Sequence, residues 1–227
     1  MDGKTLIQYL IEKGAITKDD MRDYLKEDDK KSEVITIPKI YSKITTDSVR
    51  GCVLEKFDSR DLDASGKYVT PLGVKQIMEG AFAGNKDIKS IVIRRDVERI
   101  CDRAFEGCEN LRKVEMTNFV KELGGLAFAN CSSLEMIKLS KNISYLRYGT
   151  FEGCSRLPGI ILPVKLQGID YNVFKDCENL SLMQIPCEDL YVVQKDAFTN
   201  CPIGDDFLRR FNKLKEQRKQ QSEVTPN

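Results

Sequence analysis

The chain has 227 residues, 41% of them hydrophobic and 31% charged, with a formal net charge of +1 and no histidine. These proportions are typical of a folded globular protein, and so small a net charge provides no general attraction to nucleic acid or lipid. The missing histidine excludes Ser-His and Cys-His nucleophile pairs and His-containing metal sites, and the sequence lacks GxGxxG, GxxxxGK[ST] and CxxC motifs, so we expect no enzyme and no cofactor.

Residues 1–31 predict a helical hairpin. In "KTLIQYLIEKG" the apolar residues recur at helical spacing, and Gly14 ends the helix. The segment "TKDDMRDYLKE" opens with a capping box of Thr17 and Asp20, and its apolar side chains share one face. Such a hairpin caps the neighbouring fold or, alternatively, docks onto another protein.

The start of the chain also bears on where the protein resides. Acidic residues and lysines stand too close to "LIQYLI" for a signal peptide, and no apolar run reaches the roughly 18 residues of a membrane span. We therefore expect a cytoplasmic protein if Met1 is the natural start. If it is not, an extracellular or cell-surface location is the alternative.

Residues 32–206 are built from a repeated unit. Phenylalanines recur every 23 residues, and once after 24, in the series Phe82, Phe105, Phe128, Phe151, Phe174 and Phe198. Apolar residues accompany each of them in an L-x-x-[VI]-x-[IL] block, whose alternation is typical of a short strand, and in a V-x-x-I block. A period of 20–29 residues with this core predicts a leucine-rich repeat solenoid of stacked strands, an α+β repeat fold with helical caps at both ends.

Two looser copies extend the array towards the N-terminus. "VTPLGVKQIMEGAFAG" carries Phe82, and "ITIPKIYSKITTDSVRGC" matches with Val49 in the phenylalanine position and Gly51-Cys52 after it. The longer interval between Val49 and Phe82 requires an insertion, which we place near residues 56–67. The array then has about seven coils.

The insertion contains "DLDASGKYVTPL", which is similar to a calcium-binding EF-hand loop. Asp61, Asp63 and Ser65 stand at ligand positions, and Gly66 stands at the sharp turn. The twelfth position, where a glutamate completes the calcium shell, is Leu72. This favours a solvated acidic loop, with calcium binding as the open alternative.

Most of the cysteines share one repeat position. They are Cys52, Cys108, Cys131, Cys154, Cys177 and Cys201. We expect a line of buried free thiols that pack as small apolar groups. A linear arrangement does not suit tetrahedral zinc, and disulfides between neighbouring coils would need an oxidising compartment.

The residue before each of these cysteines, and before Asn85 at the same repeat position, is Gly, Asn or Asp. The column consists of Gly51, Gly84, Gly107, Asn130, Gly153, Asp176 and Asn200. These residue types tolerate positive φ best, so the column predicts a left-handed turn in every coil.

Alternation along the strands predicts which side chains face outward. The candidate partner-binding residues are Val92, Lys113, Glu115, Met136, Lys138, Ile161, Leu182 and Gln184. This surface is charged near Lys113 and more apolar towards Leu182, which suits a protein or peptide partner. It lacks the repeated basic and aromatic residues that bind nucleic acid. The alternative is that these residues merely cover the sheet.

Residues 207–227 predict a basic amphipathic helix with a short tail. Phe207, Leu208, Phe211 and Leu214 share one face, while lysines and arginines occupy the other. We expect a cap on the last coil. Contact of the basic face with an acidic surface, such as a membrane or a nucleic acid, is the alternative.

The pattern L-x-x-[VI]-x-[IL]-P-x-x-V-x-x-I-x-x-x-A-F-x-G-C resembles the BspA-type (Treponema-type) leucine-rich repeat over about three quarters of the chain. Members of that family are often adhesins or host-interaction proteins, so the resemblance implies a binding role. We expect a non-enzymatic protein-interaction scaffold. The alternatives are a structural or adaptor subunit attached through its terminal helices, a lipid- or nucleic-acid-binding protein acting through the C-terminal helix, and a surface adhesin if the protein is exported.

Overall fold

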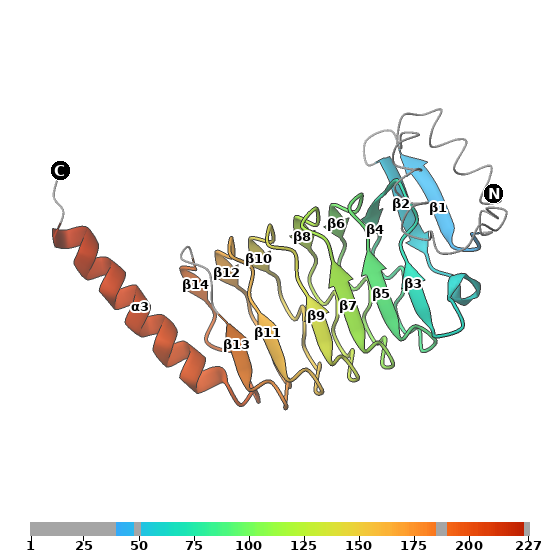
Figure 1. The fold of residues 1–227 in the computed structure, drawn as a ribbon. Helices are drawn as coiled ribbons and strands as arrows, with labels where there is room; N and C mark the ends of the chain where they lie inside the picture. The colour runs from blue at the N-terminus through green and yellow to red at the C-terminus, as the bar shows by residue number, and fades with distance from the viewer. Residues whose placement is uncertain (1–39, 48–50, 185–189, 225–227) are drawn as a thin grey trace, which may run out of the picture.

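The computed structural model describes residues 40–47, 51–184 and 190–224; the predicted N-terminal hairpin lies outside them. The chain winds into a solenoid followed by one helix, as Figure 1 shows. The predicted leucine-rich repeat fold is therefore confirmed, although the solenoid has about six coils instead of seven.

Each coil contributes one strand to what we call the first ladder. Its strands are β3 (Lys67–Val69), β5 (Ser90–Ile93), β7 (Lys113–Met116), β9 (Met136–Lys138), β11 (Gly159–Ile161) and β13 (Leu182–Gln184). Paired strands run parallel and in repeat register, with Ile91 opposite Val114. Alternate side chains enter the core, because successive residues of a strand point to opposite faces.

The V-x-x-I blocks form a second ladder that the sequence analysis did not predict. Its strands are β4 (Val74–Ile77), β6 (Arg99–Ile100), β8 (Glu122–Leu123), β10 (Tyr145–Leu146), β12 (Gly168–Ile169) and β14 (Val192–Val193). Most are only two residues long, too short to show alternation in the sequence. They form because the repeat places equivalent backbone segments side by side. We number the coils 1 to 6, from β3–β4 to β13–β14.

A continuous stack of phenylalanine rings runs through the core. It comprises Phe57, Phe82, Phe105, Phe128, Phe151, Phe174, Phe198 and Phe207. Successive ring centroids lie between 4.5 Å, at Phe57–Phe82, and 5.9 Å, at Phe128–Phe151. One coil cannot bury its own ring, so each coil depends on its neighbours for a complete core.

Four of the predicted thiols form the expected buried line. Cys108, Cys131, Cys154 and Cys177 each donate a hydrogen bond to the phenylalanine carbonyl of the preceding coil, at 3.1–3.2 Å. Burial raises the pKa of Cys108 to about 12 and that of Cys154 well above its usual value. These thiols therefore stay neutral at physiological pH and act as packing groups.

The predicted left-handed column is confirmed at all seven positions, with φ between 54° and 74°. A second left-handed column precedes the phenylalanines by two residues and was not predicted. It consists of Gly80, Arg103, Leu126, Gly149 and Asn172. Arg103 and Leu126 are residue types that rarely adopt positive φ. The residue types in this column therefore did not indicate a left-handed turn.

The predicted first coil is wrong. The segment instead forms an antiparallel hairpin of β1 (Lys43–Asp47) and β2 (Gly51–Lys56), with Thr45 opposite Val53. β2 pairs in parallel with β4, so the hairpin extends the second ladder at its N-terminal edge. Cys52 therefore lies in a strand and outside the line of thiols. The hairpin forms because β2 buries Val53 and Leu54 against the solenoid.

Phe57 takes the phenylalanine position that we had assigned to Val49, which lies outside the described residues. The Phe57 N–H donates to the Ala81 carbonyl at 2.9 Å, as the Phe105 N–H does to Ala127 at 2.8 Å. From Phe57 to Phe82 is 25 residues, against 23 or 24 between the other phenylalanines of the series. The predicted insertion near 56–67 therefore shrinks to two extra residues, and a short 3-10 turn, η1 (Ser59–Asp61), occupies this stretch.

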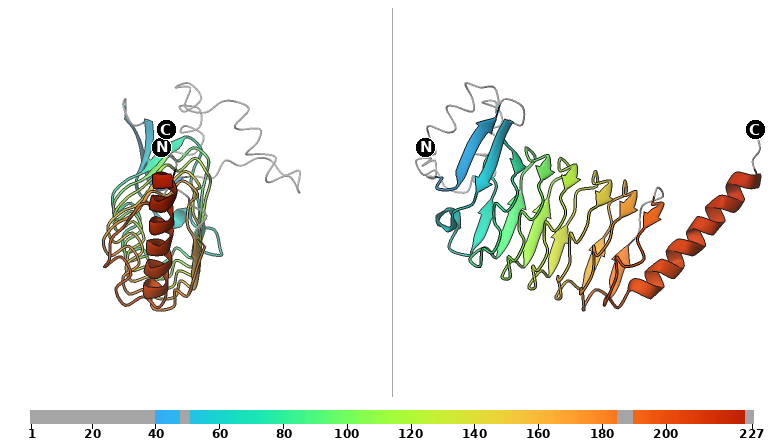
Figure 2. Two further views of the ribbon diagram at one scale, coloured as in Figure 1. Left: turned by 90° about the vertical axis from the view of Figure 1, so that its left-hand side faces the viewer. Right: turned by 180° about the vertical axis from the view of Figure 1, so that it is seen from behind.

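Helix α3 (Gly204–Val224) begins three residues before the predicted start. Its first two turns pack on the last coil: Phe207 and Phe211 are buried, and Phe207 stacks on Phe198. Leu214 is already 41% exposed. Figures 1 and 2 show the rest of the helix leading away from the solenoid, so only its beginning covers the core.

Candidate partner-binding surface

The eight candidate residues lie together on the outer side of the first ladder, and we call this set the first-ladder face. Strand register places Glu115 beside both Val92 and Lys138. The same pairing puts Lys113 beside Met136, and Ile161 beside Gln184. Val92 and Glu115 are half-buried, and the other six are exposed. The repeat thus converts distant sequence positions into one surface.

The N-terminal part of the face is charged. Lys113 Nζ lies 2.5 Å from Glu115 Oε1, and this hydrogen bond, with the nearby positive charges, lowers the pKa of the Glu115 carboxyl. Solvent reaches both side chains, which are 48% and 42% exposed, and surface ion pairs of this kind add little stability. Lys138 lies beside this pair, so the charged part of the face carries one more positive than negative side chain.

The C-terminal part of the face is apolar. Met136 is 56% exposed, Ile161 62% and Leu182 70%, and they stand on three consecutive coils. Fully burying such a side chain is worth roughly 1.5–3 kcal/mol. Three of them in one region provide a substantial driving force for association.

The first ladder is interrupted inside this apolar part. The Arg112 N–H donates to the Lys89 carbonyl of the preceding coil, and the Glu135 N–H donates to the Arg112 carbonyl in the same way. The next residue in this series is Pro158, which has no N–H to donate. Strand pairing accordingly stops at β9 and resumes with β11–β13.

A second exposed cluster lies on and beside strands β10, β12 and β14, and the sequence analysis missed it. Its members are Tyr145, Tyr148, Tyr171, Tyr191 and Val192, each 45–49% exposed. The V-x-x-I blocks had not been assigned to strands, so their outward positions could not be identified. The signal that would have revealed it is the gathering of tyrosines around these blocks in coils 4 to 6.

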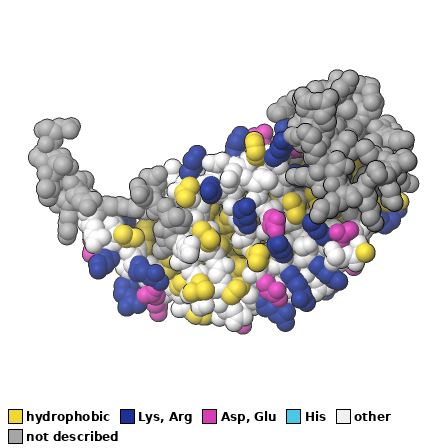
Figure 3. Space-filling model, viewed as in Figure 1, with side chains coloured by type: hydrophobic (Ala, Val, Ile, Leu, Met, Phe, Trp, Pro, Cys, Tyr) yellow, Lys and Arg dark blue, Asp and Glu magenta, His cyan; other side chains and the backbone are white. Residues whose placement is uncertain are grey.

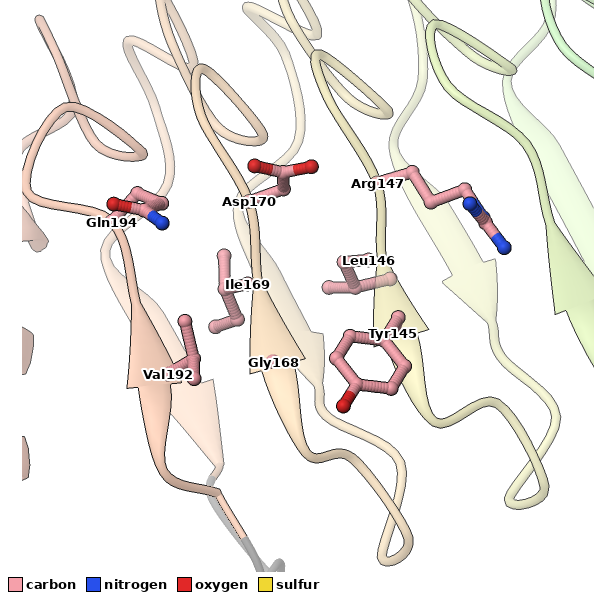
Figure 4. Close-up of a pocket in the computed structure, with 8 residues that line it drawn as sticks. All are labelled: Tyr145, Leu146, Arg147, Gly168, Ile169, Asp170, Val192 and Gln194. Atoms are coloured by element: carbon pink, nitrogen blue, oxygen red, sulfur yellow. The ribbon is translucent and has the colours of Figure 1, made fainter.

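A surface pocket of about 430 Å³ opens within this cluster. It is lined by Tyr145, Leu146, Arg147, Gly168, Ile169, Asp170, Val192 and Gln194. In Figure 4, Tyr145 and Val192 stand on either side of Gly168, with Asp170 and Gln194 above them. On the face of the molecule seen in Figure 3, hydrophobic side chains are interspersed with charged ones.

The carboxylates of the acidic loop accept hydrogen bonds from backbone N–H groups of the protein itself. Asp61 accepts hydrogen bonds from the backbone N–H groups of Tyr41 and Ser42, each at 2.7 Å. Asp63 accepts from the N–H groups of Ser65 and Lys67 at 2.8 and 3.0 Å. Across residues 40–47, 51–184 and 190–224, no group of three or more His, Cys, Asp or Glu side chains is arranged to hold a metal ion.

Comparison with protein families identifies the repeat. The model of the BspA type leucine rich repeat region matches residues 75–203 in six copies. The chain belongs to the BspA-type leucine-rich repeat family. The six matched copies agree with the six coils of this BspA-type solenoid.

Solved structures of bacterial leucine-rich repeat proteins resemble this BspA-type chain. A protein from Eubacterium ventriosum is 26% identical with a TM-score of 0.60, over 66% of this chain and 40% of that one. A leucine rich cell surface protein from Faecalibacterium prausnitzii is 25% identical with a TM-score of 0.50, over 60% and 45%. The chain thus spans less than half the length of these two proteins.

A leucine-rich repeat protein of Treponema pallidum shares the fold, with a TM-score of 0.62 at 19% identity over 75% of this chain and 93% of that one. The comparison with curated proteins gave no match. Within the described part of the chain, no helix combines the length and apolar character that crossing a membrane requires.

Proposed function

We propose that this protein is a non-enzymatic interaction scaffold that binds a protein or peptide partner through the first-ladder face. The observation that carries the proposal is the exposure of Met136, Ile161 and Leu182 on three consecutive coils. Large apolar side chains gathered on a surface and bordered by charged residues are typical of protein-binding sites. The membership of the family supports a binding role.

The architecture behind this face also favours binding. Backbone hydrogen bonds and the phenylalanine stack hold the coils together, so a partner meets a surface that is already ordered. Pre-organisation reduces the entropy lost on association. The neighbouring Lys113–Glu115 pair would add orientation and selectivity rather than affinity.

Selection of peptides from a random display library against the protein tests this proposal. The decisive variant combines Met136→Glu, Ile161→Glu and Leu182→Glu. Its matched control combines Ala64→Glu, Ala83→Glu and Phe119→Glu, which introduces the same charge at exposed neutral positions elsewhere. We expect selected peptides to bind the wild type and the control, and to bind the face variant at least about tenfold more weakly.

Thermal melting of all three proteins provides the folding control, and the midpoints should agree because every substituted residue is exposed. Equal peptide affinity for the face variant and the control would contradict the assignment of the binding site to the first-ladder face.

A role at the cell surface is the second candidate. It is favoured by the similarity to the leucine rich cell surface protein of F. prausnitzii. Brief protease treatment of intact cells of the source organism, followed by detection with an antibody, tests it. Cleavage in intact cells would support this role, and protection until the cells are lysed would exclude it.

A further inference from the structure

We propose that the partner of the first-ladder face is a peptide segment that is acidic at one end and apolar at the other. The inference rests on the proposed function and adds the chemistry of the partner to it. It is carried by the distribution of charge along the first ladder, which is positive over coils 1 to 4 and absent over coils 5 and 6.

Positively charged side chains gather on the N-terminal part of the first ladder. We consider, in each coil, the outward residues of the strand and the residue just before it. In coils 1 to 4 these positions carry two acidic residues, Glu115 and Glu135, and five basic ones. We call the five the cationic band: Lys67, Lys89, Arg112, Lys113 and Lys138. All five are exposed, so their excess positive charge is accessible to a partner.

Strand and turn register brings the members of this band together. Ser90 lies opposite Lys67 on one side and Lys113 on the other, so the two lysines stand in one column. The Arg112 N–H donates to the Lys89 carbonyl at 2.8 Å, which places these two residues on adjacent coils in the next column. Like charges held side by side by the backbone favour an anionic ligand.

The band has too few counter-ions of its own. Lys113 pairs with Glu115, whereas among the described residues the other four members form no ion pair. The hydrogen bond from Lys113 lowers the pKa of the Glu115 carboxyl, and the charges of Lys138 and Lys67 act in the same direction. Asp63 also lies near Lys67, but it accepts hydrogen bonds within its own loop. The band can therefore accept further carboxylates from a partner.

The same positions of coils 5 and 6 carry no charged residue. They are Pro158, Gly159, Ile161, Ser181, Leu182 and Gln184. Ile161 and Leu182, with Met136 on coil 4, provide the exposed apolar surface. In Figure 3, dark blue and magenta side chains lie over β3, β5 and β7, and yellow ones over β9, β11 and β13. The face thus changes from positive to apolar along the solenoid axis.

A segment with one acidic and one apolar end complements both parts of this face at once. Its carboxylates pair with lysine and arginine, while its apolar side chains are buried against Ile161 and Leu182. A nucleic acid fits less well, because the outward positions of the first ladder carry no aromatic ring on which a base could stack. Its phosphates would also meet no positive charge over coils 5 and 6.

The length of the face sets the length of the segment. Five coil intervals separate β3 from β13, which is about 24 Å for strands about 4.8 Å apart. An extended chain advances about 3.3 Å per residue, so about eight residues span the face.

Fluorescence anisotropy with a labelled peptide of four glutamates followed by four leucines tests the inference. The control peptides carry four glutamines or four lysines in place of the glutamates. We expect the protein to bind the glutamate peptide at least about tenfold more tightly than the glutamine peptide. Added salt should reduce this difference, because it screens exposed charges.

Reversal of two lysines tests whether the carboxylates bind at the cationic band. Lys67→Glu combined with Lys138→Glu should weaken binding of the glutamate peptide at least about tenfold. The same variant should bind the lysine peptide more tightly than the wild type does, a gain that misfolding would not produce. The matched control, Lys165→Glu with Lys215→Glu, changes the net charge equally at exposed lysines outside the face and should bind all three peptides as the wild type does.

A neutral variant separates this inference from the proposed function. Ile161→Ser with Leu182→Ser removes apolar surface without adding charge and should weaken the glutamate peptide at least about tenfold. Equal binding of the glutamate and glutamine peptides to the wild type, with both weakened in this variant, would leave the proposed function standing and overturn the acidic partner. If the variant binds every peptide as the wild type does, both proposals fail. Tighter binding of a single-stranded octanucleotide than of the glutamate peptide would overturn the inference in favour of nucleic acid.

Discussion

Single residues at fixed repeat positions hold this solenoid together. Each coil places one phenylalanine in the central stack. In four coils a cysteine thiol also donates a hydrogen bond to the phenylalanine carbonyl of the preceding coil. These contacts are local to neighbouring coils, so the effect of one substitution depends on its place in the stack.

Phe128→Ala removes a fully buried ring from the middle of the stack. We expect it to lower the free energy of unfolding by about 3–5 kcal/mol, because it loses apolar burial and leaves a cavity. Phe119→Ala is the control, since Phe119 is 55% exposed and should change stability by less than about 0.5 kcal/mol. Urea denaturation of both variants measures the difference; equal losses would refute the assigned register.

The left-handed column permits a test of backbone conformation alone. Gly84 has φ of 68°, and no atom lies within 4 Å of where its Cβ would stand. Gly84→Val should therefore cost of order 1–2 kcal/mol through strain at positive φ. Gly84→Asn should cost clearly less, since Asn tolerates this region. Thermal or chemical denaturation gives both values, and an equally mild effect of Val would show that this turn relaxes.

At the scale of elements, helix α3 has two parts with different roles. Its first two turns continue the phenylalanine stack through Phe207, whereas the remainder leaves the solenoid. The amphipathic pattern predicted the contact but not the departure. An apolar stripe shows which face is suited to packing, but not how far the surface beneath it extends.

This division predicts contrasting effects within one helix. Phe207→Ala should destabilise the protein by about 3 kcal/mol, because it uncovers the end of the stack. Leu214→Ala should stay within about 0.5 kcal/mol, because that side chain is 41% exposed. Chemical denaturation of both variants checks the expectation. A comparable loss for Leu214→Ala would mean that α3 packs along more of its length.

The strands show a similar division between what was predicted and what was not. Alternation in the first block placed the eight residues of the first-ladder face correctly on the outer side, with Ile161 and Leu182 the most exposed of the apolar ones. Their role in binding stays a prediction. The two-residue strands of the second ladder gave no such alternation, so the tyrosine cluster and the pocket within it were missed.

At the scale of the whole molecule, the solenoid has a weak junction around coil 4. Strand pairing in the second ladder is absent between β8 and β10, and in the first ladder between β9 and β11, both within the described ranges. Phe128–Phe151, at 5.9 Å, is also the widest step of the stack. Coil 4 therefore has strand pairing with each neighbour in one ladder only, in addition to the turn hydrogen bonds and the phenylalanine stack.

We expect hydrogen exchange to show two levels of protection. Paired amides of coils 1 to 3 should exchange more slowly than those of coils 5 and 6, with the change at coil 4, because a repeat array opens at its weakest interface. Mass spectrometry of peptic fragments after exchange measures this. Uniform protection from coil 1 to coil 6 would indicate that the phenylalanine stack and the turn hydrogen bonds couple all coils equally.

The sequence by itself determined the repeat period, the phenylalanine positions from Phe82 to Phe198, the buried line of four cysteines, one left-handed column and the outward residues of the first ladder. Each of these features depends on residues within one repeat and recurs from repeat to repeat, so the local sequence pattern is enough to predict it. Only the tertiary structure decided that β1 and β2 form a hairpin, that the V-x-x-I blocks pair into a second ladder, and that Tyr145, Gly168 and Val192 meet. Those outcomes depend on which backbone segments lie side by side, and hydrogen bonds between distant residues settle that choice.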